Sequence, residues 1–190
     1  GRGAPIEDAI DLPEADAPPE SGDATDDPTG NSPAGGEYNG LTEYQAAFDA
    51  LREGDLETCR RKLRELYAQR PNLPPPQMML ARLLLTNRQF ASARATLEEI
   101  ADAQHDHPYL YLLFGKLALA DGHVTDAAIH FEKVKALKLP ENWTESQTKH
   151  LAGQLLAGEI AIAERRGKWD DAARLYQQQI TAQPKNAILR

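Results

Sequence analysis

The 190-residue chain contains few of the residues on which several kinds of site depend. Its single cysteine, Cys59, excludes an internal disulfide and any zinc site built from several thiolates. No apolar run is long enough to span a membrane, and no signal peptide is visible. The chain also lacks an initiator methionine. We therefore expect a fragment that lies in the cytoplasm or on the soluble side of an anchored envelope protein.

Residues 1–40 contain almost no basic or aromatic side chains. They hold ten acidic residues, one basic residue, six prolines and seven glycines. Such a segment cannot bury enough apolar surface to offset the entropy of ordering it, so we predict a disordered acidic tail or linker over 1–40. Residues 41–190 carry 20 basic and 19 acidic residues, and this near-neutral balance predicts no nucleic-acid partner.

Beyond residue 40, four segments of the chain share one pattern. They begin at Gly54, Arg88, Gly122 and Gly167, with offsets of 34, 34 and 45 residues. A large apolar residue stands two places after each start. A small residue stands three places after that one, and a second large residue stands four places after the small one. This spacing describes one face of a helix. In chain order, the three columns are Leu56, Phe90, Val124 and Trp169; Cys59, Ala93, Ala127 and Ala172; and Leu63, Leu97, Phe131 and Tyr176.

A second helix is expected upstream of each of these segments. Three of the four carry a small residue seven places before the segment start, at Ala47, Ala81 and Gly115. Small side chains allow two helix backbones to approach closely, as an antiparallel pair with a short turn requires. We therefore predict helix-turn-helix units over about 41–73, 74–107, 108–141 and 142–190.

At these columns the sequence resembles the tetratricopeptide repeat family. The closest match is "YLYLLFGKLALADGHVTDAAIHFEKV", in which Tyr111, Phe114, Gly115, Ala127 and Phe131 occupy the family's places. The resemblance implies an all-α, right-handed superhelix of about four repeats. It also implies a scaffold or adaptor that binds a peptide or protein segment in a concave groove, and no enzyme activity.

The family's groove positions fall on the first helix of each unit. A mixture of apolar and basic residues there favours an acidic partner, although the apolar ones could instead pack within or between repeats. The candidates are Tyr44, Phe48, Arg52, Met78, Arg82, Leu85, Tyr109, Leu112, Lys116, Leu119 and, in poorer register, Ala161 and Arg165.

Some family members grip the C-terminal carboxylates of heat-shock chaperones through a clamp of lysine, asparagine and arginine. The matching positions here hold Tyr44, Phe48, Met79, Tyr109 and Leu113. The clamp is therefore absent, and we do not expect this chain to bind chaperone tails.

The last offset exceeds the period by 11 residues, which is about three helical turns. We predict one long helix near 144–166 that projects about 16 Å beyond its neighbours, the alternative being a longer loop at 139–144. Thr144 with Gln147, and Thr42 with Gln45, have the spacing of a capping box. Asp121-Gly122 and Arg166-Gly167 mark turns inside two pairs.

The chain ends in "PKNAILR", which reads like the start of another repeat and provides no polar terminal cap. This feature supports a second hypothesis, self-association through the C-terminal end. A third is an accessory domain of a larger enzyme or membrane-anchored protein. The acidic tail adds the hypothesis that it occupies the groove in cis, with a simple linker as the alternative.

Catalytic and metal-binding patterns are scarce. His105-Asp106-His107 is the one local cluster of metal-ligand types, but no third ligand has a distinctive spacing, so we interpret it as an inter-repeat loop. Cys59 occupies a small-residue column, which favours a buried structural role over a nucleophile. The sequence contains no glycine-rich phosphate loop or nucleophile elbow. We therefore expect no cofactor and no metal.

Overall fold

The computed structural model describes residues 42–182. This part of the chain forms eight α-helices and no strand, which confirms the predicted all-α repeat architecture. The acidic segment 1–40 and the repeat-like end lie outside the described residues. The helices are α1 (Thr42–Arg52), α2 (Leu56–Gln69), α3 (Pro76–Thr86), α4 (Phe90–Ala101), α5 (Pro108–Ala120), α6 (Val124–Ala136), α7 (Glu145–Arg165) and α8 (Trp169–Ala182).

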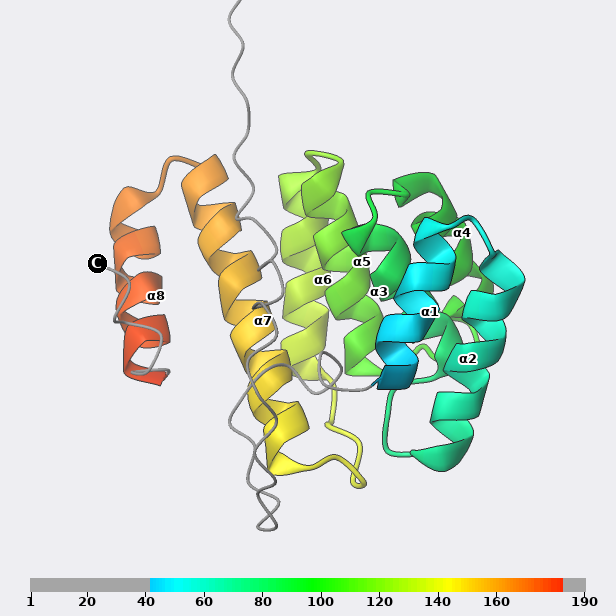
Figure 1. The fold of residues 1–190 in the computed structure, drawn as a ribbon. Helices are drawn as coiled ribbons and strands as arrows, with labels where there is room; N and C mark the ends of the chain where they lie inside the picture. The colour runs from blue at the N-terminus through cyan, green and yellow to red at the C-terminus, as the bar shows by residue number, and fades with distance from the viewer. Residues whose placement is uncertain (1–41, 183–190) are drawn as a thin grey trace, which may run out of the picture. The chain divides into compact units, whose positions relative to one another are not determined.

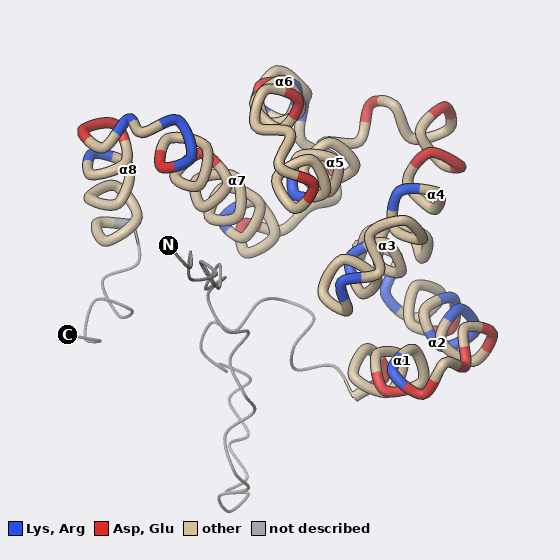
Figure 2. Tube along the Cα trace, turned by 90° about the horizontal axis from the view of Figure 1, so that it is seen from above, with Lys and Arg blue, Asp and Glu red and all other residues tan. Residues whose placement is uncertain are grey.

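The helices are arranged in two layers. Each helix packs against the next one along the chain, so that α1–α2, α3–α4, α5–α6 and α7–α8 form four pairs (Figure 1). The first helices of successive pairs also contact one another, α1 with α3, α3 with α5 and α5 with α7, whereas the second helices do not. The first helices therefore form a continuous layer, which lies on the inner side of the curve that Figure 2 shows.

All four pairs turn through the same backbone motif. Each turn has one residue in the left-handed region: Gly54 (φ 85°), Arg88 (φ 56°), Gly122 (φ 79°) and Gly167 (φ 67°). In each case the next residue donates its N–H to a carbonyl five residues earlier, as in Asp55 to Ala50 and His123 to Ala118. This is the Schellman arrangement, which satisfies carbonyl groups at a helix end. The two predicted turns at Gly122 and Gly167 are confirmed.

The small-residue column lies at the seam of each pair. Cys59, Ala93, Ala127 and Ala172 are all buried, at most 3% exposed. The following column of large residues is buried in the first three pairs and exposed in the fourth, where Tyr176 is 44% exposed. This column normally lies beneath the first helix of the next pair, and in the described part of the chain α8 contacts α7 alone.

Phe131 shows how closely the third and fourth pairs pack. Its ring lies between two glycines, Gly115 on α5 and Gly158 on α7. A Cβ atom at Gly115 would lie 2.1 Å from the ring, and one at Gly158 would lie 2.4 Å away. The absence of side chains at these positions allows α5 and α7 to enclose the ring from both sides.

The predicted long helix is confirmed as the 21-residue α7, which extends beyond α6 at its N-terminal end (Figure 1). The predicted capping box is also present: Thr144 accepts from the N–H of Gln147, whose Oε1 accepts from the N–H of Thr144 at 2.8 Å. The extension does not project freely, because Gln147 Nε2 donates to the carbonyl of Asn72, in the loop before α3, at 2.8 Å.

The second predicted capping box, at Thr42 and Gln45, lies at the edge of the described residues and stays a prediction. Thr42 is the first residue of α1, and the side-chain amide of Gln45 donates to Asp49 Oδ1 at 3.0 Å. No helix in the described range is both long and apolar enough to cross a membrane.

Candidate functional site

One row of side chains runs along the layer of first helices. Phe48, Arg82, Lys116 and Ala161 each lie six residues before the left-handed residue of their own turn, and each is half-buried. Because the position recurs on α1, α3, α5 and α7, the four residues face the same side of the layer. We call this row, together with His150 and Gln154 of α7, the inner face.

The structure divides the predicted groove residues into two groups. Five are buried, at most 9% exposed, and belong to the core, so a partner would not reach them; they are Tyr44, Met78, Tyr109, Leu112 and Leu119. The others keep at least part of their surface: Phe48, Arg82, Leu85, Lys116 and Ala161 are half-buried, and Arg52 and Arg165 are exposed. Arg165 has a structural contact as well, since its guanidinium donates to the carbonyl of Leu119 at the end of α5.

Arg82 lies near the centre of the inner face. Its guanidinium carbon is 5.8 Å from the centre of the Tyr44 ring, within the range of a cation–π contact. Burial raises the pKa of the Tyr44 and Tyr109 hydroxyls, and the nearby charge of Arg82 partly opposes this effect in both. Arg82 therefore lies among buried phenols of α1 and α5.

Lys116 is held by a short chain of hydrogen bonds from α7. Its Nζ donates to Gln154 Oε1 at 2.8 Å, and Gln154 Nε2 is hydrogen-bonded to His150 Nε2. An ammonium group can only donate, so Gln154 must turn its oxygen toward Lys116 and its NH₂ toward His150. His150 then accepts through Nε2 and carries its proton on Nδ1.

Positive charges lie near both Lys116 and His150. Burial lowers the pKa of Lys116 to about 8, and the neighbouring charge of Arg82 contributes. Burial likewise lowers the pKa of His150 to about 4, with Arg82 and Lys116 contributing. Arg82 and Lys116 are also the sole charged residues of α3 and α5, two otherwise apolar helices. The centre of the inner face therefore holds two basic side chains that are partly removed from water.

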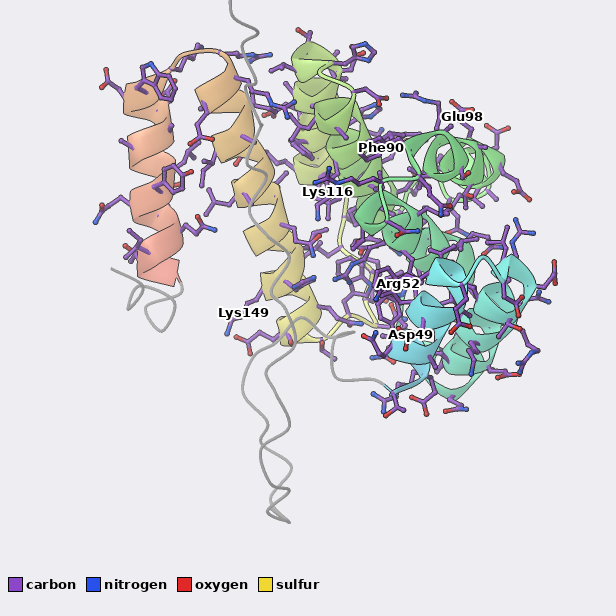
Figure 3. The ribbon with its side chains drawn as sticks, turned by 45° about the horizontal axis from the view of Figure 1, so that its top comes forward. Asp49, Arg52, Phe90, Glu98, Lys116 and Lys149 are labelled. Carbon is purple, nitrogen blue, oxygen red and sulfur yellow. The ribbon has the colours of Figure 1, made fainter. Side chains whose placement is uncertain are left out.

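The carboxylates of α7 are engaged elsewhere. Glu145 pairs with Lys149, Glu159 with Lys135, and Glu164 accepts from the hydroxyl of Tyr176. No ion pair between residues of the described range includes Lys116. Figure 3 shows Lys116 enclosed by side chains of neighbouring helices, whereas Lys149 extends away from the N-terminal end of α7.

Sequence reasoning identified Gln147 as part of a helix cap, but it did not identify the contact of Gln147 with Asn72 or the roles of His150 and Gln154. Their spacing contained a signal, because Gln147, Leu151, Gln154 and Gly158 follow one another at intervals of four, three and four residues. That interval places them on one face of a helix. The eleven-residue extension of α7 could therefore have been expected to turn this face toward α5 and the loop before α3.

The His105-Asp106-His107 segment does not converge on one point. His105 Nε2 lies 3.2 Å from Asp106 Oδ2. His107 instead packs edge-on against Trp143, and its Nδ1 accepts from the N–H of Tyr109 at the start of α5. In the described residues, no group of three or more His, Cys, Asp or Glu side chains is placed to hold a metal ion.

Cys59 is fully buried, as predicted, and burial raises the pKa of its thiol to about 11. A separate hollow of about 290 Å³ lies between α2, α3 and α4. It is lined by residues of both charges, including Arg60, Arg64 and Glu99. Both arginines are exposed, so this hollow lacks the buried, single-sign charge of the inner face.

A comparison with protein families matched residues 50–117 to the tetratricopeptide repeat. This segment runs from the end of α1 into α5, so it includes both Arg82 and Lys116. A comparison with curated proteins returned no match.

Proposed function

We propose that this chain, whose residues 50–117 match the tetratricopeptide repeat family, is a scaffold or adaptor whose inner face binds a segment of another protein. The observation that supports this role is the half-buried row of Phe48, Arg82, Lys116 and Ala161 along the layer of first helices. A row of this kind presents one side chain per repeat, and so suits a partner segment that lies along several helices.

The α1 end of the row and its centre differ in character. At the α1 end, Phe48 and the nearby Leu85 of α3 offer partly buried apolar surface, whereas Arg82 and Lys116 offer positive charge. A partner segment would place an apolar residue against Phe48 and a polar or charged one over the cations. Apolar anchors surrounded by directional polar contacts are the usual basis of affinity for such segments.

A cross-linking experiment tests this proposal. A photoreactive phenylalanine analogue at position 48, on the inner face, should form an adduct with a protein partner in an extract of the source cells. The same analogue at position 129 on α6 is the control, because Ile129 is 62% exposed. If position 129 gave the same adducts, or position 48 gave none, the inner face would not be the binding surface.

A second candidate function is self-association through α8. Trp169, Tyr176 and Ile180 are exposed on that helix by 68%, 44% and 47%, although the residues equivalent to Tyr176 in the other pairs are buried. Such a face would accept a helix of a second copy. Light scattering at about 100 μM would reveal the resulting dimer, since weak contacts of this size have micromolar dissociation constants. A monomer at that concentration excludes this candidate.

A further inference from the structure

We propose that α8 pairs antiparallel with the α8 helix of a second copy, through a stripe formed by Trp169, Ala173, Tyr176 and Ile180. In this pair Trp169 packs against the partner's Ile180, and Ala173 packs against the partner's Tyr176. The inference rests on the second candidate function, self-association through α8, and adds the residues and the orientation of the contact. We call the four residues the apolar stripe.

The apolar stripe lies exposed along one face of α8. Its members are separated by four, three and four residues, which places them on one side of the helix. Ala173 is exposed, and the three large members are exposed by 68%, 44% and 47%. In the described range α8 contacts α7 alone, at the end of the layer of helices (Figure 1). An exposed apolar surface gathered on one helix in this way is typical of a protein–protein contact.

The equivalent stripes on the other three second helices are each interrupted by a basic residue. Arg60 of α2 and Arg94 of α4 stand at the position of Ala173, and Lys135 of α6 stands at the position of Ile180. The stripe of α8 contains no charged residue. Depletion of charge among aromatic and aliphatic side chains distinguishes the core of an interface from the rest of a protein surface.

The polar groups beside the stripe already have partners within the chain. In the last ten residues of α8, Arg174 is the one charged residue, and it pairs with Asp171 at 2.9 Å. The hydroxyl of Tyr176 donates to Glu164 Oε1 of α7 at 2.8 Å. A second helix can therefore cover the tyrosine ring without leaving a buried donor unsatisfied.

The spacing of the stripe is the same in both chain directions, so the stripe is complementary to itself. An antiparallel pair aligns Trp169 with the partner's Ile180 at both ends and Ala173 with the partner's Tyr176 on both sides of the centre. A twofold interface requires this reciprocity, in which each contact occurs twice. The small alanine also leaves room for the tyrosine ring, as interdigitating side chains require.

Charge disfavours the other pairings of α8 with a second copy. A parallel pair would bring the carboxylates of Asp170 and Asp171, both in the first turn of α8, next to their counterparts, whereas an antiparallel pair separates them. Stacking of α8 on α1 of another copy would meet a polar surface. The helix α1 exposes no large apolar side chain and presents Glu43, Asp49 and Arg52.

Analytical ultracentrifugation of the full chain tests the pairing. The wild type should form a dimer at about 100 μM, and Ala173→Arg, which introduces the residue found at this position in α2 and α4, should weaken dimerisation at least about tenfold. Gln178→Arg is the matched control, because Gln178 is exposed on the opposite side of α8. It should leave the dimer unchanged, and equal effects of the two variants would overturn the proposal.

Disulfide trapping tests the orientation of the two helices. Cys59 is fully buried, so cysteines introduced at the ends of the stripe are the reactive thiols. An equimolar mixture of Trp169→Cys and Ile180→Cys chains should form the mixed disulfide under mild oxidation. Neither chain alone should form a disulfide, because like positions lie about 16 Å apart along an antiparallel pair. A disulfide in either chain alone, or none in the mixture, would overturn the proposal.

The outcomes distinguish this inference from the functions proposed above. A dimer that persists in Ala173→Arg would leave self-association in place and remove the antiparallel α8 pair alone. A wild-type chain that dimerises only after deletion of residues 183–190 would identify that segment as the occupant of the stripe and overturn the proposal. None of these results changes the cross-link from position 48, which tests the inner face separately.

Discussion

Lys116→Met should stabilise the folded chain at pH 7. Burial and Arg82 lower the pKa of Lys116 from 10.5 to about 8, which corresponds to a cost of about 3 kcal/mol for keeping the group charged in the folded state. The substitution also removes the hydrogen bond from the charged ammonium group to Gln154, worth about 2 kcal/mol. Methionine is close to lysine in volume and apolar throughout. We therefore expect a net gain of about 1 kcal/mol in the free energy of unfolding.

The pH dependence makes this prediction specific. Below pH 8 both folded and unfolded states hold the proton of Lys116, so the full cost is present. Between pH 8 and 10.5 the folded state releases the proton while the unfolded state keeps it, so wild-type stability rises with pH relative to Lys116→Met. Urea denaturation of both proteins at pH 7 and pH 10 should show the advantage of methionine shrinking.

Two results would refute the reasoning. One is a loss of stability in Lys116→Met at pH 7, which would mean that the lysine is compensated in the folded chain. The other is a difference between the two proteins that does not change between pH 7 and pH 10.

Three other predictions concern single positions. Gly158→Ala should destabilise the fold by about 2 kcal/mol in urea denaturation, although alanine favours helices, because its Cβ would lie 2.4 Å from the Phe131 ring. Arg88→Gly should raise the thermal midpoint through a gain of about 1 kcal/mol, since it relieves a left-handed backbone with φ 56°. Burial lowers the pKa of His107 to about 4, so between pH 6.5 and 4 the unfolded state takes up a proton that the folded state does not. Stability measured by urea denaturation should therefore fall by up to about 3 kcal/mol as the pH drops through that range, and His107→Asn should remove this dependence while keeping an N-cap acceptor.

Each of these predictions has a matched comparison. Phe131→Leu should recover part of the loss in Gly158→Ala, and a simple sum of the two effects would contradict the proposed clash. Gly122→Ala should act in the opposite direction to Arg88→Gly, because it introduces strain at the equivalent turn. An unchanged pH profile in His107→Asn would assign the acid sensitivity to another group.

The repeat pattern in the sequence predicted much of the fold. The spacing of small and large residues predicted the helix pairs, the turns at Gly122 and Gly167, and the long helix with its cap at Thr144. These features depend on local backbone chemistry and on periodicity, which a sequence displays directly.

The exposure of the groove residues was harder to predict. The helices α3 and α5 are apolar on nearly every side, so periodicity does not distinguish the inner face from the seams between helices. Tyr109 and Leu112 are consequently buried, whereas Lys116, one turn later, reaches the inner face. The contact of Gln147 with Asn72 joins residues 75 positions apart, and a local pattern does not encode such a distance.

The central claim is that the inner face binds a segment of another protein. Hydrogen exchange on the complex with the cross-linked partner tests this claim most directly. If the inner face binds that partner, the backbone amides of α1, α3, α5 and α7 should gain protection, while those of α2, α4 and α6 should not change. Protection confined to α8 or to the second helices would contradict the account.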